Sequence, residues 1–154
     1  MIKWIFILML SIVVPEGRLT NIQLSYLRDN YEKAVSDKKL CETIIKDLEN
    51  NTQSNVHLAY LGAFQTIWAN HVFNPFSKLE TFNKGKANIE LAVKREGNSA
   101  EIRFIRLSVQ ANCPGFLGYS GNIQQDKLFL KKHLGEVSPD QLKKMIENLL
   151  TQLT

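Results

Sequence analysis

Apolar side chains recur at intervals of three and four residues through three successive segments in the middle of the chain, the spacing of one face of an α-helix. The first predicted helix covers residues 55–72. The second begins at Asn74-Pro75, where Asn74 is a suitable N-cap and Pro75 takes the first helical position. The third follows a break at residues 97–99. These segments predict three apolar helices around which the rest of the chain packs.

Gly62 and Gly85 lie inside the first two of these predicted helices. If the chain reverses between Phe73 and Asn74, both glycines stand at the same height of an antiparallel hairpin, roughly 17 Å from the bend. A glycine within a helix costs about 1 kcal/mol relative to alanine, so a close crossing of the two backbones would explain both residues. The alternative is that the glycines are incidental, since helices tolerate them.

Helix-start signals also occur outside the central segments, and they predict N-caps at Thr20, Ser36, Asn122 and Ser138. Residues 112–121 combine three glycines and a proline with apolar side chains, which predicts a structured loop over the core. No segment shows the sustained alternation of a strand. We therefore predict an all-α fold of about seven helices in stacked antiparallel hairpins, either a repeat-like right-handed array or an irregular bundle.

The beginning of the chain carries a basic head at residues 1–3 and an apolar run at residues 4–14. A membrane-spanning helix needs about 20 apolar residues, so this run is too short to cross a bilayer and fits a secretory signal peptide. We predict a signal peptide at 1–17 and one helical domain at 18–154, exported to the periplasm or secreted, with no membrane span after leader removal. Because no small-x-small cleavage site follows the run, an uncleaved anchor or a buried strand is the alternative.

The formal net charge of +4 makes the protein mildly basic. Its lysines are scattered along the chain, whereas a nucleic-acid-binding protein is expected to show a dense basic stripe with stacking aromatic residues. The charge pattern therefore argues against a nucleic-acid partner.

The histidines and cysteines form no catalytic or metal-binding motif. No two of His57, His71 and His133 stand four residues apart, the spacing that puts two ligands on one helix face, so we predict no metal, cofactor or catalytic residue. Cys41 and Cys113 either form a disulfide, as an oxidising compartment would allow, or stay buried free thiols, which the apolar surroundings of Cys41 favour. A nucleophilic Cys113 with His71 as its base is a further alternative.

Charged residues interrupt the third central helix, which is otherwise apolar. Glu101 lies near its start, and Arg103 and Arg106 are three residues apart, so the two arginines share a face and could clamp a carboxylate or phosphate of a bound partner. Alternatively, the arginines pair inside the fold and hold the helices in register. The internal partners that this alternative offers are Glu80, Glu90 and Glu101.

A second group of candidate binding residues lies at the predicted hairpin bend, where aromatic rings are edged by amide and imidazole groups. Its members are Trp68, Asn70, His71 and Asn74, with Phe73 and Phe76 beside them. Together with Tyr119 from the irregular loop they could line a ligand pocket. The alternative is a turn that caps its helices and packs its rings into the core.

The second central helix resembles the second helix of a tetratricopeptide repeat. Gly85, Ile89, Ala92 and Gly97 fall at the spacing of the small, aromatic, alanine and proline positions of that helix, although isoleucine replaces the aromatic residue and glycine the proline. The connection is about 11 residues longer than the 34-residue unit allows, so the resemblance is to a degenerate or extended repeat. It implies helical hairpins with a protein-binding surface.

Three other segments, 70–76, 101–106 and 114–119, make the chain similar to small exported helical proteins of bacteria whose function is unassigned. That resemblance implies export.

The sequence thus predicts a non-enzymatic exported module that binds a peptide or protein partner of the cell envelope in the groove between its stacked hairpins. One alternative is a small-ligand carrier or an enzyme, with a pocket edged by His71, Glu101, Arg103 and Tyr119. Another is a structural envelope subunit, which should expose an apolar patch on its first or last helix.

Overall fold

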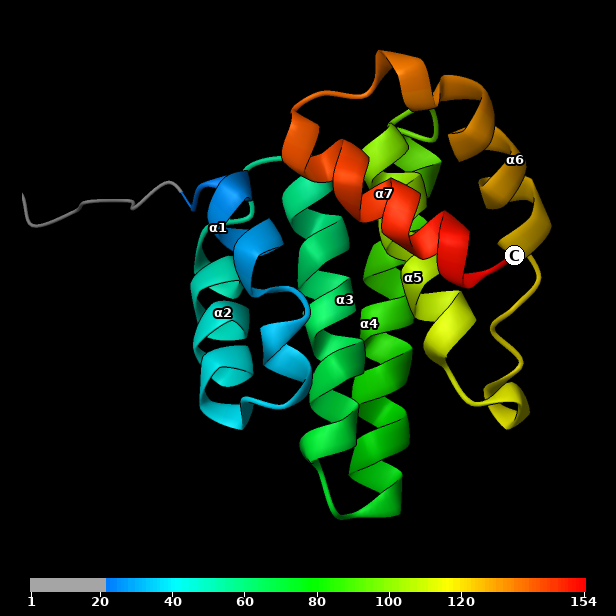
Figure 1. Cartoon of the computed structure of the whole chain (residues 1–154). Coiled ribbons are helices and arrows are strands. Elements are labelled where there is room, and N and C mark those ends of the chain that lie inside the picture. Colours follow the sequence, from blue (N-terminus) through cyan, green and yellow to red (C-terminus); the bar gives the residue numbers. More distant parts are fainter. Residues whose placement is uncertain (1–21) are drawn as a thin grey trace, which may run out of the picture.

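The computed structural model describes residues 22–154, and within this range the chain forms α-helices and short 3-10 helices without any strand (Figure 1). In chain order these are α1 (Leu24–Asn30), η1 (Lys33–Val35), α2 (Lys38–Asn50), α3 (Asn55–His71), α4 (Pro75–Arg95), α5 (Ala100–Asn112), η2 (Gly115–Leu117), α6 (Ile123–His133), η3 (Leu134–Glu136) and α7 (Asp140–Gln152). The predicted all-α fold is confirmed for this part of the chain. The predicted leader at 1–17 and the predicted cap at Thr20 lie outside it.

The helices pack around α3. A first short hairpin of α1, η1 and α2 lies beside a longer hairpin of α3 and α4 (Figure 1). Helix α5 contacts both α3 and α4, α6 packs against α5, and α7 contacts both α5 and α6. Because α3 touches α2, α4 and α5 at once, it is apolar around most of its surface, as its sequence predicts.

Helices α3 and α4 make the most extensive helix–helix contact of the described chain, and their backbones touch where Gly62 faces Gly85. A Cβ atom added to Gly62 would lie 2.5 Å from the carbonyl oxygen of Gly85 and 3.0 Å from the amide nitrogen of Ile89. A Cβ atom at Gly85 would collide with the carbonyl oxygen of Gly62 in the same way. The predicted close crossing is therefore confirmed, and both positions require glycine.

Two predicted helix starts are confirmed by their side-chain caps. Asn74 Oδ1 accepts hydrogen bonds from the N–H groups of Phe76 and Ser77, at 2.9 and 3.1 Å. Ser99 Oγ accepts from the N–H of Ile102 at 3.3 Å. These bonds satisfy donors that would otherwise be unpaired at the first turns of α4 and α5.

The predicted caps at Ser36 and Ser138 are wrong by one residue each. Helix α2 is capped by Asp37, whose carboxylate accepts from the N–H of Leu40 at 2.9 Å, because Ser36 closes the preceding helix η1. Pro139 stands at the N-cap of α7 and makes no side-chain cap. In each case the helix begins one residue later than the first favourable residue in the sequence.

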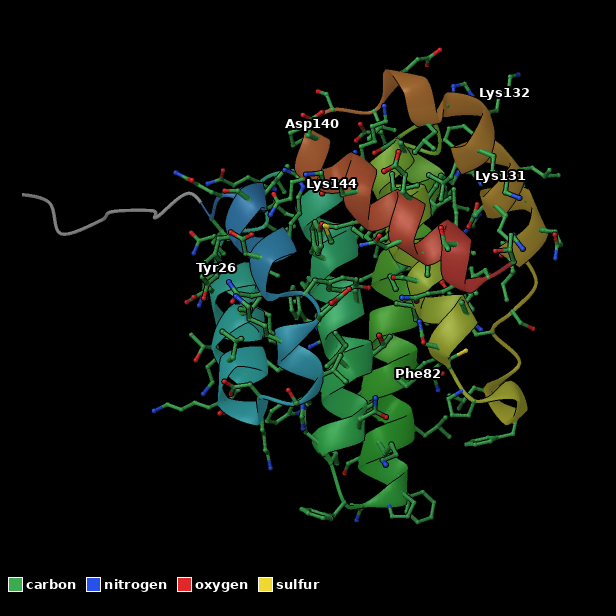
Figure 2. The ribbon with its side chains drawn as sticks, viewed as in Figure 1. Tyr26, Phe82, Lys131, Lys132, Asp140 and Lys144 are labelled. Atoms are coloured by element: carbon green, nitrogen blue, oxygen red, sulfur yellow. The ribbon has the colours of Figure 1, made fainter. Side chains whose placement is uncertain are left out.

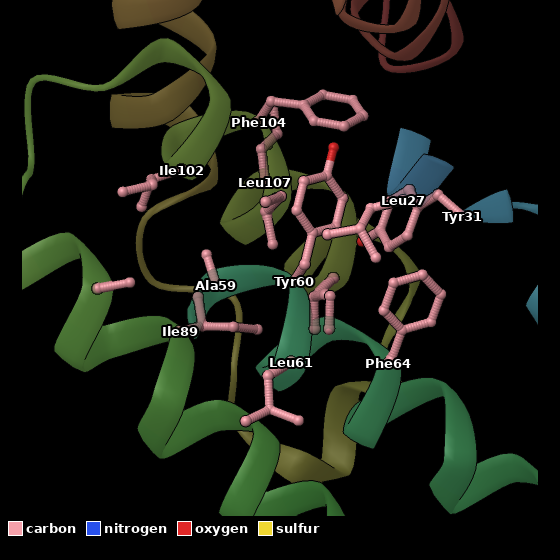
Figure 3. Packing of buried hydrophobic residues seen from close by; sticks show 14 of the residues in the cluster. Leu27, Tyr31, Ala59, Tyr60, Leu61, Phe64, Ile89, Ile102, Phe104 and Leu107 are labelled. Carbon is pink, nitrogen blue, oxygen red and sulfur yellow. The ribbon is translucent and has the colours of Figure 1, made fainter. Parts of the chain in front are cut away.

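The core is centred on aromatic rings from three parts of the chain (Figure 3). Tyr31 directly follows α1 and meets the rings of Tyr60 and Phe64 on α3 edge to face, with centroid distances of 5.7 Å in both cases. Phe104 on α5 approaches the same tyrosine at 6.2 Å. The Tyr31 hydroxyl is 2.7 Å from Ser108 Oγ, so the buried phenol also has a hydrogen-bond partner.

The segment 112–121 is a structured loop, as predicted. Tyr119 is buried at 5% exposure and seats the loop on the core, whereas Phe116 is 88% exposed. Gly118 has a φ of 62°, a left-handed conformation that favours glycine. Asn122 stands at the predicted N-cap of α6, but its side chain bonds to the side chains of its neighbours instead of the helix backbone. Among the described helices, none has the length and hydrophobicity of a membrane span.

Candidate functional site

Both candidate arginines of α5 are bound to one carboxylate, Asp126 on α6. Arg106 Nε and Nη2 donate to Asp126 Oδ2 and Oδ1 at 2.7 and 2.8 Å, and Arg103 Nη1 donates to Oδ1 at 2.8 Å. Asp126 is fully buried and Arg106 is 4% exposed. The two-pronged geometry is the strongest form of an arginine–carboxylate pair. The arginines therefore pair inside the fold, which is the second of the two alternatives that the sequence leaves open.

The same network reaches α4 and the loop through Glu90. Arg106 Nη1 donates to Glu90 Oε2 at 3.3 Å, and the Tyr119 hydroxyl donates to Glu90 Oε1 at 2.7 Å. Burial lowers the pKa of Arg106, but the bonds and charges of Asp126 and Glu90 outweigh it, so the net pKa is raised. Burial, followed by the contact with Glu90, raises the pKa of Tyr119 and keeps the phenol a donor. The network joins α4, α5, α6 and the loop.

Glu90 is one of the internal partners expected from the sequence, but Asp126 is not, and Glu80 forms no salt bridge within residues 22–154. The sequence does contain a signal for Asp126. Ile123, Asp126 and Leu130 are three and four residues apart, so the carboxylate shares the apolar face of its helix. A buried acid in that position indicates a cationic partner inside the fold.

Glu101 belongs to a different buried cluster on the other side of α5. It accepts two hydrogen bonds from Arg28, from Nε at 2.8 Å and from Nη2 at 2.7 Å, and a third from the Tyr60 hydroxyl at 2.8 Å. Burial raises the pKa of Tyr60 well above its ordinary value, and the negative charge of Glu101 acts in the same direction. This cluster fastens α1 to α3 and α5.

The four residues that were expected to edge a shared pocket do not meet. His71 Nε2 is 2.9 Å from the carbonyl oxygen of Ala34, Glu101 is held by Arg28, and Arg103 and Tyr119 belong to the Asp126 network. Each polar group is used by a nearer partner in the fold. The expected pocket is therefore not formed by these side chains.

Cys41 and Cys113 are free thiols, as favoured from the sequence. Cys41 is buried and its Sγ donates to the carbonyl oxygen of Phe64 at 3.4 Å, and burial raises its thiol pKa to about 12. Cys113 Sγ donates to the carbonyl oxygen of Tyr119 at 3.2 Å, and burial raises its pKa as well. A raised pKa disfavours the nucleophilic thiolate. His71 binds Ala34 instead, so the structure does not form the suggested Cys113–His71 pair.

Residues 22–154 contain no group of three or more histidine, cysteine, aspartate or glutamate side chains arranged to hold a metal ion. His57 is used structurally, with Nε2 2.8 Å from the carbonyl oxygen of Ile22 and Nδ1 2.7 Å from Ser54 Oγ. His133 is 3.2 Å from the exposed carboxylate of Glu136.

The structure contains a candidate site in a groove between the two hairpins. It has a volume of about 270 Å³ and runs over α3 between α2 and α4. Its lining comprises Glu42, Ile45, Lys46 and Glu49 from α2, Gln65 and Trp68 from α3, and Thr81 and Lys84 from α4. Of the binding residues expected from the sequence, only Trp68 lies here.

Gln65 at the floor of this groove has an unpartnered donor. The residue is 2% exposed, and its Oε1 accepts from Asn88 Nδ2 at 2.8 Å, whereas its Nε2 has no hydrogen-bond partner in the structure. A buried donor without an acceptor costs about 1–3 kcal/mol. Native proteins retain few such groups, and each calls for an explanation. One explanation is that a bound molecule supplies the acceptor for Gln65 Nε2.

The rim of the groove is charged but internally balanced. Lys46 Nζ and Glu42 Oε1 are 2.8 Å apart on α2, and Lys84 Nζ on α4 is 3.1 Å from Glu49 Oε1 on α2. The second pair spans the groove from wall to wall. Both pairs are well exposed, so they contribute little to stability and can separate at small cost.

The remaining candidates, Asn70 and Asn74, lie at the solvent-exposed end of the α3–α4 hairpin. Asn74 caps α4, as the turn interpretation holds. The neighbouring rings do not pack into the core, however, because Phe73 is 96% exposed and Phe76 is 85% exposed. The turn interpretation is thus right for the cap and wrong for the rings.

Residues 22–154 therefore present a groove with an apolar and amide floor between the hairpins, a second hollow lined by Glu101, His133 and Leu142 among others, two internal charge clusters, and an exposed apolar hairpin end. Comparison with known proteins adds no assignment to these features, since no family model, curated protein or solved structure matches the chain.

Proposed function

We propose that this protein is a non-enzymatic binding module that holds a peptide segment of a partner protein in the groove between α2, α3 and α4. The observation that carries the proposal is the unpartnered Gln65 Nε2 at the groove floor. A peptide carbonyl is the commonest strong acceptor that a protein partner offers, and Gln65 is the amide side chain that lines the groove. Ile45 and Trp68 supply apolar surface on either side for a peptide side chain.

The proposed setting is the cell envelope, because the apolar run at residues 4–14 fits a signal peptide. The ligand-carrier and enzyme alternative has less support, since Glu101, Arg103 and Tyr119 already have internal partners. The structural-subunit alternative predicts an apolar patch on the first or last helix, and on α1 only Tyr26, at 41% exposure, is an exposed large hydrophobic residue.

The test begins with a displayed library of random peptides selected on the immobilised full chain. Affinities of the enriched peptides are then measured by calorimetry for the wild type and for Gln65→Leu and Ile45→Asp. We expect Gln65→Leu to weaken binding by about tenfold, the loss of one hydrogen bond, while conserving side-chain volume. Ile45→Asp should abolish binding by placing a charge on the apolar part of the groove.

Leu128→Asp is the matched control, because Leu128 is 68% exposed on α6, which does not line the groove. Thermal unfolding of each variant confirms that it folds. Failure to enrich any peptide, or equal affinity of all variants for the enriched peptides, would overturn the proposal.

A further inference from the structure

The end of the α3–α4 hairpin carries apolar side chains that the fold does not use. Phe73 and Phe76 are 96% and 85% exposed, and Leu79, one turn further along α4, is 47% exposed. We call these three residues the apolar tip. Exposed apolar groups gathered at one place commonly mark an interaction site. The peptide groove does not explain them, since none of the three lines it.

The shape of this end is convex. In Figure 1 the α3–α4 hairpin extends further than any other described helix at the lower end of the molecule. The apolar tip is therefore shaped to insert into a partner, and it offers no concave surface into which a partner could insert. A bilayer interface accepts such a projection without a preformed complementary pocket.

Lysines stand directly behind the apolar tip. Lys38 Nζ is 5.4 Å from the ring centroid of Trp68 and 6.0 Å from that of Phe73, and Lys78 lies in the first turn of α4. Neither lysine forms a salt bridge with another described residue. Both are therefore available to anionic groups outside the protein.

The backbone adds to this positive character. Helices α2 and α4 both begin at this end of the molecule, and neither has an acidic residue in its first turn. Helix N-termini carry a partial positive charge that favours anions. The acidic residues of this end are Glu32, Asp37, Glu42 and Glu80. Asp37 is engaged as the cap of α2, and Glu42, one turn from Lys38, is paired with Lys46.

We propose that the apolar tip inserts into the interfacial region of a bilayer of anionic phospholipids. Phe73 and Phe76 enter the boundary between headgroups and acyl chains, and Lys38 and Lys78 lie at the level of the phosphates. Aromatic rings favour this depth, and lysines near an anionic surface add electrostatic attraction. Neither the two rings nor the two lysines line the peptide groove, so this proposal does not depend on peptide binding.

The test follows insertion of the tip itself, because the apolar run at residues 4–14 of the full chain can bind lipid on its own. The chain has two tryptophans, so Trp4→Phe with Trp68→Phe gives a tryptophan-free background. Phe76→Trp then places a single reporter at the tip. Leu128→Trp places the matched control reporter on α6, at another exposed position. Far-ultraviolet circular dichroism checks that each variant is folded.

The two chains are mixed with vesicles of phosphatidylcholine and phosphatidylglycerol, with and without doxyl-labelled lipid. We expect the emission of the tip reporter to shift to the blue and to lose most of its intensity to the doxyl quencher, while the control reporter changes in neither respect. An unshifted tip reporter on sedimented vesicles, or equal shifts of both reporters, would overturn the proposal.

Charge reversal tests the headgroup preference in the same reporter chain. Lys38→Glu with Lys78→Glu should raise the lipid concentration for half-maximal shift by about tenfold or more. Lys131→Glu with Lys132→Glu changes the net charge equally on α6, away from the hairpin end (Figure 2), and should change it by less than about twofold. Equal effects of the two pairs, or full insertion into pure phosphatidylcholine vesicles, contradict the anionic preference.

Discussion

Asp126 is a single carboxylate that holds two arginines at once in a place that water does not reach. Removing charges from water is costly, and the cost is met only where every charged group has well-aligned partners. Here both oxygens of Asp126 are used, and Glu90 takes up a further donor of Arg106. The arrangement makes the residue more important to folding than its position on a short surface helix suggests.

Replacing Asp126 by asparagine should therefore be strongly destabilising. The variant keeps the shape of the side chain but removes the fully buried negative charge that both Arg103 and Arg106 contact, and leaves Arg106 with only the more exposed Glu90, which costs about 3–5 kcal/mol of the free energy of unfolding. Urea denaturation followed by circular dichroism measures the loss. Asp47→Asn, on the exposed face of α2, is the control and should change stability by less than about 0.5 kcal/mol. Similar midpoints for the two variants would contradict the role assigned to Asp126.

At the same scale, the sequence identifies Arg103 and Arg106 as unusual because they interrupt an apolar stripe. It does not identify Asp126 as their partner, since the contact joins residues 20 positions apart across an irregular loop. Helical periodicity describes which residues share a face of one helix and carries no information on which two helices meet. The sequence does not predict the unpartnered donor of Gln65 for a similar reason. Whether its amide has a partner depends on which side chains of α2 and α4 surround it.

At the scale of the helix, local chemistry predicts most of the structure. Asn74 caps α4 as predicted, and Ser99 caps α5 at the predicted break of residues 97–99, where Asn98 is also a favourable capping residue. Ser36 and Asp37 are adjacent and both favourable, so the choice between them depends on how η1 ends. The crossing of α3 and α4 could be predicted because Gly62 and Gly85 are about equally far from the bend, which is a property of the sequence alone.

The crossing of these two helices yields a prediction for Gly85→Ala. Alanine is the better helix former by about 1 kcal/mol, but its methyl group would collide with the carbonyl oxygen of Gly62, so we expect a net destabilisation of about 1–3 kcal/mol. Urea denaturation measures the change. Gly135→Ala is the control, because a Cβ atom there meets nothing within 4 Å. An unchanged or higher stability of Gly85→Ala would mean that the helices can separate without loss.

At the scale of the whole molecule, the all-α class follows from the sequence, whereas the function does not. Periodicity predicts helices wherever they occur, but the groove is formed by side chains from three separate helices. The aromatic core joins other parts of the molecule, since Tyr31, Tyr60 and Phe104 connect the first hairpin with α3 and α5. The free energy of unfolding should therefore depend on whether the buried tyrosine hydroxyls are protonated.

We expect the molecule to lose stability at alkaline pH. Burial raises the pKa of Tyr31 from 10.0 to about 12, against the opposing hydrogen bond with Ser108. The unfolded chain thus releases this proton at a lower pH than the native protein does. Stability is complete below pH 10 and falls as the pH rises towards 12, by up to about 3 kcal/mol for this residue.

Urea denaturation at successive pH values measures this decline. Tyr31→Phe, which has no phenol proton, should be less stable at neutral pH, because its hydrogen bond with Ser108 Oγ is lost, but should show a shallower alkaline decline. Equal alkaline slopes for the variant and the wild type would contradict the role of Tyr31.

The contact of Gly62 with Gly85 has a mechanical consequence. Where two backbones touch without side chains between them, there is no layer of rotatable groups to absorb shear, so the paired helices move as one stiff lever. A force at Phe73 would therefore be transmitted along both helices together, towards Ala59 and Ile89, which are buried in the core.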